Sequence, residues 1–113
     1  MDIEILHVDQ CPNSDEAGVR VKEALAEVGL VDVAVSYRLL ATDDEAAAVP
    51  FAGSPTILID GVDALPGADR VTDLACRVYP TEDGLKGYPT VDQLAAVIRE
   101  RGGSVINRED FPT

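Results

Sequence analysis

The sequence predicts a single α/β domain in which a four-stranded mixed sheet carries helices on both faces. The length of 113 residues is that of one domain. Short β-type runs alternate with segments of helical periodicity in the order β-α-β-α-β-β-α. The composition, with 46% hydrophobic and 27% charged residues, is typical of a globular chain and not of a disordered one.

The first half of this order is a βαβ unit. Residues 3–8 alternate apolar and polar side chains, as a half-buried strand does. The next segment is a helix of about 15 residues, capped by Asn13 or Ser14 and closed by Gly29. Its apolar residues recur at helical spacing: Ala17, Val21, Ala24, Leu25 and Val28. Residues 32–40 form the second strand, parallel to the first through a right-handed crossover.

The second half begins with a short helix and a hairpin. Thr42 to Glu45 is a capping box, and the Ala-rich helix that it opens ends at Pro50. Residues 56–59 are a β-rich run followed by Asp60-Gly61, a hairpin turn signal. Residues 62–65 are then the returning strand of that hairpin.

The domain is expected to span residues 1–103. Residues 66–89 form an insertion before the last helix, which opens with a capping box at Thr90 to Gln93 and stops at Gly102-Gly103. Residues 104–113 are expected to be a flexible C-terminal tail.

The net charge narrows the range of partners. Nine Lys and Arg residues against 21 Asp and Glu residues give −12. Binding to nucleic acid or to an anionic membrane surface needs basic residues, so neither partner is expected. The sequence has no apolar run of transmembrane length and no basic segment before an apolar one, and we expect a cytoplasmic protein.

The chain has two cysteines, Cys11 and Cys76, which are too few for a disulfide scaffold. Cys11 precedes the first helix, where unpaired N–H groups favour a thiolate, but Asp9, Asp15 and Glu16 oppose ionisation, so we expect weak activation. Cys76 lies in an apolar run. It is either a buried, inert thiol or, if the insertion folds back over the first helix, a partner of Cys11.

The element order resembles the thioredoxin fold, and two motifs agree with it. The first is Cys11-Pro12-Asn13-Ser14, a C-x-x-S motif between the first strand and the first helix. The second is the block of residues 54–61, Ser-Pro-Thr-Ile-Leu-Ile-Asp-Gly, which is similar to the cis-proline loop, third strand and turn of that family. The resemblance covers roughly residues 1–65 and 90–101.

The resemblance implies a role for each of these residues. Cys11 is the nucleophilic thiol, and Ser14 replaces the resolving cysteine and donates a hydrogen bond to the thiolate, unless it serves only as a helix cap. Pro12, Ser54 and Pro55 form the substrate-binding surface. With Pro55 in the cis form, the Ser54 backbone lies beside Cys11 and pairs with an incoming extended chain. The alternative is an ordinary loop proline.

A shorter segment is similar to the organomercurial lyase family. Cys76-Arg77-Val78-Tyr79 lies 65 positions after Cys11, and an acidic turn follows at residues 81–85. This resemblance implies that Cys11 and Cys76 both bind mercury. The acid of the family motif is replaced by Ser14, and Asp15 is one position off, about 100° around the helix.

Other side chains near the cysteines allow two interpretations. Arg77, Tyr79 and Tyr88 either bind an anionic substrate group and activate Cys76, or are a solvated arginine and two half-buried rings. His7, the only histidine, is interpreted as a packing residue of the first strand.

Three functions follow from the sequence. The first is thiol–disulfide chemistry at Cys11, with Cys76 or an external thiol as its partner and a protein or low-molecular-weight thiol or disulfide as substrate. The second is a soft-metal or organomercurial site made of both cysteines. The third is a non-catalytic binding domain. No cofactor is expected, and the sequence does not indicate an oligomeric state.

Overall fold

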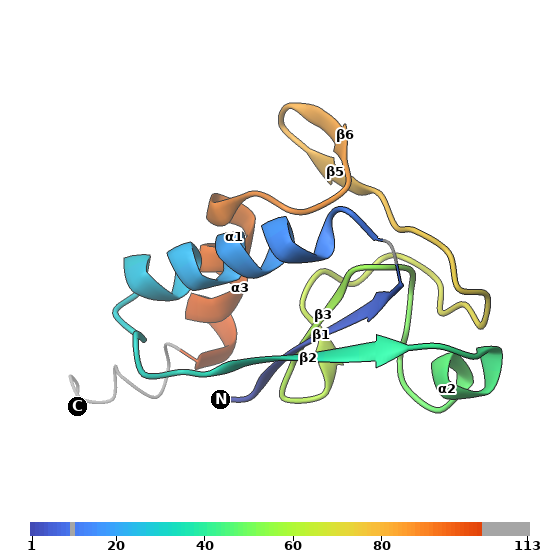
Figure 1. Ribbon diagram of the computed structural model, residues 1–113. Helices are drawn as coiled ribbons and strands as arrows, with labels where there is room; N and C mark the ends of the chain where they lie inside the picture. Colours follow the sequence, from blue (N-terminus) through green and yellow to red (C-terminus); the bar gives the residue numbers. More distant parts are fainter. Residues whose placement is uncertain (10, 103–113) are drawn as a thin grey trace.

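The core of the fold is a four-stranded mixed sheet with the strand order β2-β1-β3-β4 (Figure 1). The computed structural model describes residues 1–9 and 11–102. The four strands are β1 (Ile3–Val8), β2 (Val35–Leu40), β3 (Thr56–Ile59) and β4 (Val62–Asp63). β1 is parallel to β2, whereas β3 is antiparallel to both β1 and β4. The predicted mixed sheet is therefore confirmed.

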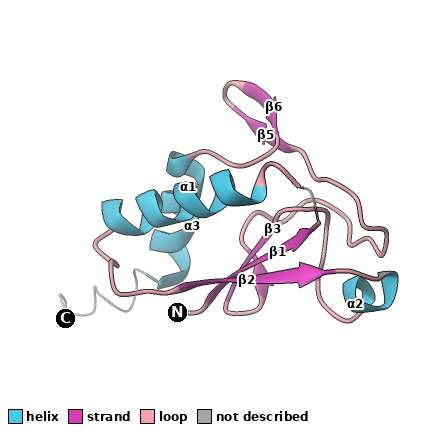
Figure 2. Ribbon diagram, in the orientation of Figure 1, coloured by secondary structure: helices cyan, strands magenta, loops and turns pink. Residues whose placement is uncertain are grey.

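Apolar side chains cover both faces of this sheet. One face packs against α1 (Ser14–Glu27) and α3 (Val91–Gly102), and the other against α2 (Asp43–Ala47) and the segment that follows it. Figure 2 shows α1 and α3 together on one side and α2 beyond the end of β2. The first cluster includes Ile3, Ile5, Val21, Leu25, Ile57, Ile59, Leu94 and Ile98. The second includes Leu6, Val8, Leu40, Leu58 and Phe51. Helices on both faces are thus confirmed.

The predicted turns and two of the predicted caps form with the expected chemistry. Thr42 accepts a hydrogen bond from the Glu45 N–H, and the Glu45 carboxylate accepts one from the Thr42 N–H, each at 3.1 Å. Thr90 and the amide of Gln93 exchange equivalent bonds at the start of α3. Asp60 and Gly61 have φ values of 51° and 83°, as a two-residue hairpin turn with positive φ at both positions requires.

Two predicted strands are shorter in the structure. The strand expected over residues 32–40 begins at Val35, because the Val33 N–H bonds to the Leu30 carbonyl in a turn after α1. The strand expected over residues 62–65 ends at Asp63. Its carboxylate accepts a hydrogen bond from the Leu65 N–H at 2.9 Å, a side-chain turn that redirects the chain.

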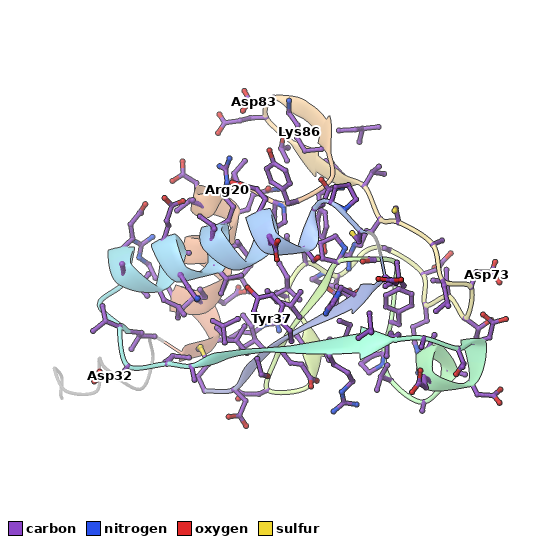
Figure 3. The ribbon with its side chains drawn as sticks, in the orientation of Figure 1. Arg20, Asp32, Tyr37, Asp73, Asp83 and Lys86 are labelled. Carbon is purple, nitrogen blue, oxygen red and sulfur yellow. The ribbon has the colours of Figure 1, made fainter. Side chains whose placement is uncertain are left out.

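The insertion contains a hairpin that the sequence analysis did not predict. It is formed by β5 (Tyr79–Thr81) and β6 (Gly84–Lys86), and it projects from the sheet near the first turn of α1 (Figure 1). In Figure 3, Asp83 and Lys86 mark this hairpin, whereas Asp73 marks the part of the insertion near α2.

Two further predictions concern the C-terminal tail and the absence of a membrane-spanning segment. The tail predicted at residues 104–113 lies outside the described residues. Over residues 1–9 and 11–102, no helix has both the length and the apolar character needed to cross a membrane.

Candidate functional site

Cys11 lies where the chain leaves β1 for α1. Its N–H donates a hydrogen bond to the Val8 carbonyl at 3.4 Å, which ties it to the end of the strand. The side chain is partly buried and packs against the cluster that contains Leu6 and Phe51, and Pro12 beside it is exposed. The thiol therefore stands at the N-terminal end of α1, where backbone N–H groups point out of the helix.

The first turn of α1 is not capped as the sequence predicts. Asn13 is the N-cap residue, but its side chain makes no cap hydrogen bond. It packs against the insertion instead, since a Cβ added to Gly87 would lie 2.3 Å from the Asn13 amide nitrogen. Ser14 is buried, and its hydroxyl donates to the Cys11 carbonyl oxygen at 3.2 Å, so here it bonds to the Cys11 backbone and not to the sulfur.

Ser54 stands opposite the end of β1. The peptide bond between Ser54 and Pro55 is cis, as the resemblance implies. Because Thr56 pairs with Leu6 in the antiparallel ladder, Ser54 comes opposite Val8. The Ser54 hydroxyl accepts the Val8 N–H at 3.1 Å in a fully buried position, and the backbone groups of Ser54 are left to bond elsewhere.

Those backbone groups bind the insertion. The Ser54 N–H donates to the Ala75 carbonyl at 2.8 Å, and the Arg77 N–H donates to the Ser54 carbonyl at 2.9 Å. These bonds form a parallel bridge between Ser54 and Cys76. We call residues 75–77 the edge segment, because they extend the outer edge of the sheet beyond β4. The Ser54 backbone, predicted to pair with an incoming chain, thus pairs with this protein's own chain.

The two cysteines are linked by a short series of contacts. Cys76 pairs with Ser54, the Ser54 side chain bonds to Val8, and the Val8 carbonyl accepts the Cys11 N–H. Both cysteines are free thiols, and Cys76 is exposed. The prediction of a buried Cys76 is therefore wrong, because only the neighbours Arg77 and Tyr79 turn inward from this part of the insertion.

A glycine makes the approach of the edge segment possible. Gly53 has a φ of 104°, a conformation that L side chains rarely adopt. A Cβ at this position would lie 2.7 Å from the Arg77 Cβ and 3.0 Å from its Cα. Only a residue without a side chain allows the backbones at Gly53 and Arg77 to come this close.

Arg77 is buried and is held by partners within the chain. Its side chain is 4% exposed, Nη1 donates to Asp63 Oδ2 at 2.8 Å, and Nη2 donates to the Leu65 carbonyl at 2.5 Å. Its guanidinium lies 4.4 Å from the ring centre of Tyr79, whose hydroxyl donates to the Pro55 carbonyl. The interpretation of Arg77 as a solvated side chain is therefore wrong, because Asp63 and Leu65 supply acceptors inside the protein, whereas its binding of an anionic substrate group stays a prediction. Tyr79 is fully buried, whereas a half-buried ring was predicted.

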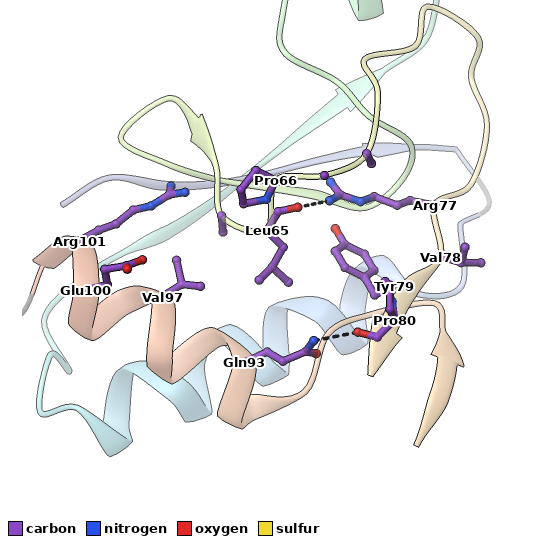
Figure 4. A pocket seen from close by; sticks show the side chains of 13 residues that line it. Leu65, Pro66, Arg77, Val78, Tyr79, Pro80, Gln93, Val97, Glu100 and Arg101 are labelled. Carbon is purple, nitrogen blue, oxygen red and sulfur yellow. Dashed lines mark hydrogen bonds between the residues drawn. The ribbon is translucent and has the colours of Figure 1, made fainter. Parts of the chain in front are cut away.

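A cavity of about 510 Å³ lies on the other side of Arg77 (Figure 4). It is bounded by the insertion, the chain after β4 and α3, and none of Cys11, Ser54 and Cys76 lines it. The Gln93 side chain donates to the Pro80 carbonyl at 2.8 Å across this region. The contact connects α3 to the insertion, and the cavity is separate from the thiols.

The other side chains singled out in the sequence make packing and electrostatic contacts within the protein. His7 meets the ring of Tyr37 edge-on at 6.1 Å, which confirms its packing role. Burial raises the pKa of Tyr37, and the negative charge of Asp15 raises it further. Arg20 lies 5.0 Å from the ring centre of Tyr88. In the ranges the structure describes, no three or more His, Cys, Asp or Glu side chains form a group able to hold a metal ion.

Comparison of the chain with protein-family models, curated proteins and solved structures found no match. The geometry of the candidate site therefore rests on this structure alone. Gly53 and Asp63, which hold the edge segment in place, were not recognised from the sequence. The glycine directly before Ser54-Pro55 is a sequence signal for close backbone approach that points to the first of them.

The ion pair between Arg77 and Asp63 predicts that two substitutions lower the free energy of unfolding by very different amounts. In Asp63→Ala the charge of Arg77 is left buried without its partner, and the free energy of unfolding falls by about 3 kcal/mol. The control Glu4→Ala removes the ion-pair partner of Arg38, whose side chain is 51% exposed. Its free energy of unfolding is expected to fall by less than about 1 kcal/mol. Urea unfolding of both variants measures this, and equal losses would contradict the assigned role of Arg77.

The buried hydroxyl of Tyr79 predicts that the stability of the fold decreases at alkaline pH. Burial raises the pKa of its hydroxyl far above the ordinary value, although the charge of Arg77 acts in the opposite direction. The unfolded chain releases this proton near pH 10, so the stability is intact below about pH 10 and falls above it, by up to about 1.4 kcal/mol per pH unit.

Substitution of tyrosine by phenylalanine isolates this contribution. Tyr79→Phe removes its share of the fall between about pH 9 and pH 11, so the stability of this variant falls less over that range than the stability of the wild type. Tyr37, whose pKa is also raised, accounts for part of the fall that remains. Urea unfolding at the two pH values measures the difference, and an unchanged fall in Tyr79→Phe would rule out the explanation.

Proposed function

We propose that this protein is a thioredoxin-like domain that performs thiol–disulfide exchange through Cys11, with Cys76 as its internal second thiol. The observation that carries the proposal is the bridge between Ser54 and Cys76 at the cis-proline loop. The second cysteine thereby pairs with the residue whose side chain bonds to Val8 at the end of β1, three residues before Cys11.

The topology supports the thioredoxin-like part of this proposal. The four strands form a mixed sheet in which β3 is antiparallel to β1, in agreement with the mixed sheet expected from the element order that carries the resemblance. α1 and α3 pack together on one face, and Cys11 precedes α1. The cis-proline precedes β3 at the same end of the sheet as Cys11.

The proposed chemistry needs two steps. In the first, the Cys11 thiolate attacks one sulfur of a disulfide R–S–S–R, forms a mixed disulfide and releases one thiolate. In the second, the Cys76 thiolate attacks the Cys11 sulfur and releases the other thiolate. Two electrons pass from the two protein thiols to the substrate. Ser14 has no sulfur for the second step, and the exposed Cys76 supplies one.

A soft-metal site is the second candidate, favoured by the same pair of free thiols. Thiolates are the ligands that soft metals select, and both cysteines are free and at least partly exposed. The organomercurial lyase reaction has less support, because a serine stands at the acid position and Asp15 is one position off in α1. Metal binding without lyase chemistry is therefore the form of this candidate that we retain.

Mild oxidation tests the proposed function. After equilibration of the reduced protein with oxidised glutathione and an acid quench, mass spectrometry is expected to show the loss of two hydrogen atoms and a peptide crosslink between Cys11 and Cys76. Cys76→Ser is expected to accumulate a mixed disulfide at Cys11, because its second step is missing. Cys11→Ser is the matched control and should form no internal disulfide. A Cys11 that stays unmodified in the wild type would leave the non-catalytic domain as the function.

Calorimetry with Hg²⁺ tests the second candidate. If both thiolates bind one ion, Cys76→Ser is expected to lower the affinity by more than roughly tenfold, since it removes one of the two soft ligands. Val78→Ser, which changes an exposed neighbour and leaves both sulfurs, is the control. Equal affinity in the wild type and Cys76→Ser would remove the two-thiol metal site.

A further inference from the structure

The edge segment occupies the backbone positions that an extended substrate would need at the cis-proline loop. An extended chain that docks on a strand edge gains its affinity from main-chain hydrogen bonds. At Ser54 the one N–H donor and the carbonyl that faces the edge are already bonded to Ala75 and Arg77. A polypeptide substrate would have to displace this segment before it could pair with Ser54.

We infer that Cys11 acts on small disulfides and not on disulfides held within an extended polypeptide chain. This inference rests on the thiol–disulfide exchange proposed above and names its substrate class. A small disulfide needs only access to Cys11, a partly exposed residue, and no strand pairing with Ser54. It is also the oxidant of the reaction: it takes up two electrons and leaves as two thiols, while Cys11 and Cys76 form one disulfide.

The edge segment is a fixed part of the structure. Arg77 is held by Asp63 and Leu65 through its buried guanidinium. The segment before residue 75 is also tied down. The Val71 N–H donates to the Phe51 carbonyl at 2.8 Å, and the Arg70 side chain donates to the carbonyls of Ala47 and Val49. Displacing the segment means breaking these hydrogen bonds and the ion pair between Arg77 and Asp63, which the two backbone hydrogen bonds gained by a peptide at Ser54 do not compensate.

The fit at Gly53 indicates which substitutions loosen the segment. Gly53→Ala places a Cβ 2.7 Å from the Arg77 Cβ and therefore pushes the segment outward. Gly29→Ala is its matched control, since Gly29 also has a positive φ but a Cβ there meets nothing within 4 Å. Tyr79→Phe is a milder variant that removes the hydrogen bond to the Pro55 carbonyl, and Tyr88→Phe is its control.

The test compares two probes with the same reacting group. One is the disulfide of N-acetylcysteine methylamide. The other is the disulfide of an uncharged nine-residue peptide with the same cysteine at its centre. For each probe, the rate constant of the reduced protein is divided by the rate constant of free N-acetylcysteine methylamide with the same probe. This division removes the intrinsic reactivity of the disulfides. Amide hydrogen exchange at Ser54 and Arg77 reports whether the segment has opened.

In the wild type, the normalised rate constant for the peptide disulfide is expected to be no higher than that for the small disulfide. In Gly53→Ala, and to a lesser extent in Tyr79→Phe, the peptide should gain up to roughly tenfold over the small disulfide, the effect of two restored backbone hydrogen bonds. The two control variants should behave as the wild type does. These expectations follow from the bonded backbone of Ser54.

Three results would overturn the inference in distinguishable ways. A wild type that reacts several-fold faster with the peptide keeps the exchange reaction and removes the small-substrate class. The same holds if hydrogen exchange shows an open segment in Gly53→Ala and the peptide gains no rate. A Cys11 that reacts with neither probe removes the exchange reaction itself, and the inference with it.

Discussion

The candidate site depends on three hydrogen bonds made by Ser54. Its hydroxyl accepts the Val8 N–H, its own N–H donates to Ala75, and its carbonyl accepts the Arg77 N–H. Ser54 is fully buried, so each of these groups would cost about 1–3 kcal/mol if it were left without a partner. Because the side chain bonds to β1, the backbone is free to bond to the insertion. One residue thereby fixes the strand that leads to Cys11 and the segment that carries Cys76.

The insertion completes the sheet as well as contributing a thiol. β4 pairs with β3 at Leu58 and Ile59, and the Ala64 N–H donates to the Ile57 carbonyl, so without the insertion the backbone of Ser54, just before β3, would lack partners. The edge segment covers the sheet edge at Ser54, and the side chain of Arg77 crosses to Asp63 at the end of β4. The same few residues therefore close the sheet edge, bury one charge pair and leave Cys76 exposed next to Ser54.

Local patterns in the sequence predict the elements, and contacts distant in sequence decide the site. The capping boxes at Thr42 and Thr90 and the Asp60-Gly61 turn form within four residues, so their chemistry is readable from the sequence. The burial of Arg77 depends on Asp63, 14 residues away, and the side chain of Asn13 packs on Gly87 in the insertion. The β5–β6 hairpin also escaped prediction, because its strands have three residues each and one holds Pro80, which is a weak strand signal.

For the proposed exchange reaction, the same contacts matter because they hold Cys76 in place without a structural disulfide. A disulfide between cysteines 65 positions apart would reduce the entropy of the unfolded chain and stabilise the fold by about 4 kcal/mol in the chain-entropy model. In this structure both cysteines are free, and the edge segment is already held by Ser54, Arg77 and Tyr79. The position of Cys76 is therefore fixed without the sulfur–sulfur bond. A thiol pair whose surroundings persist in the reduced state is available for repeated oxidation and reduction, because neither step requires the fold to form or to be lost.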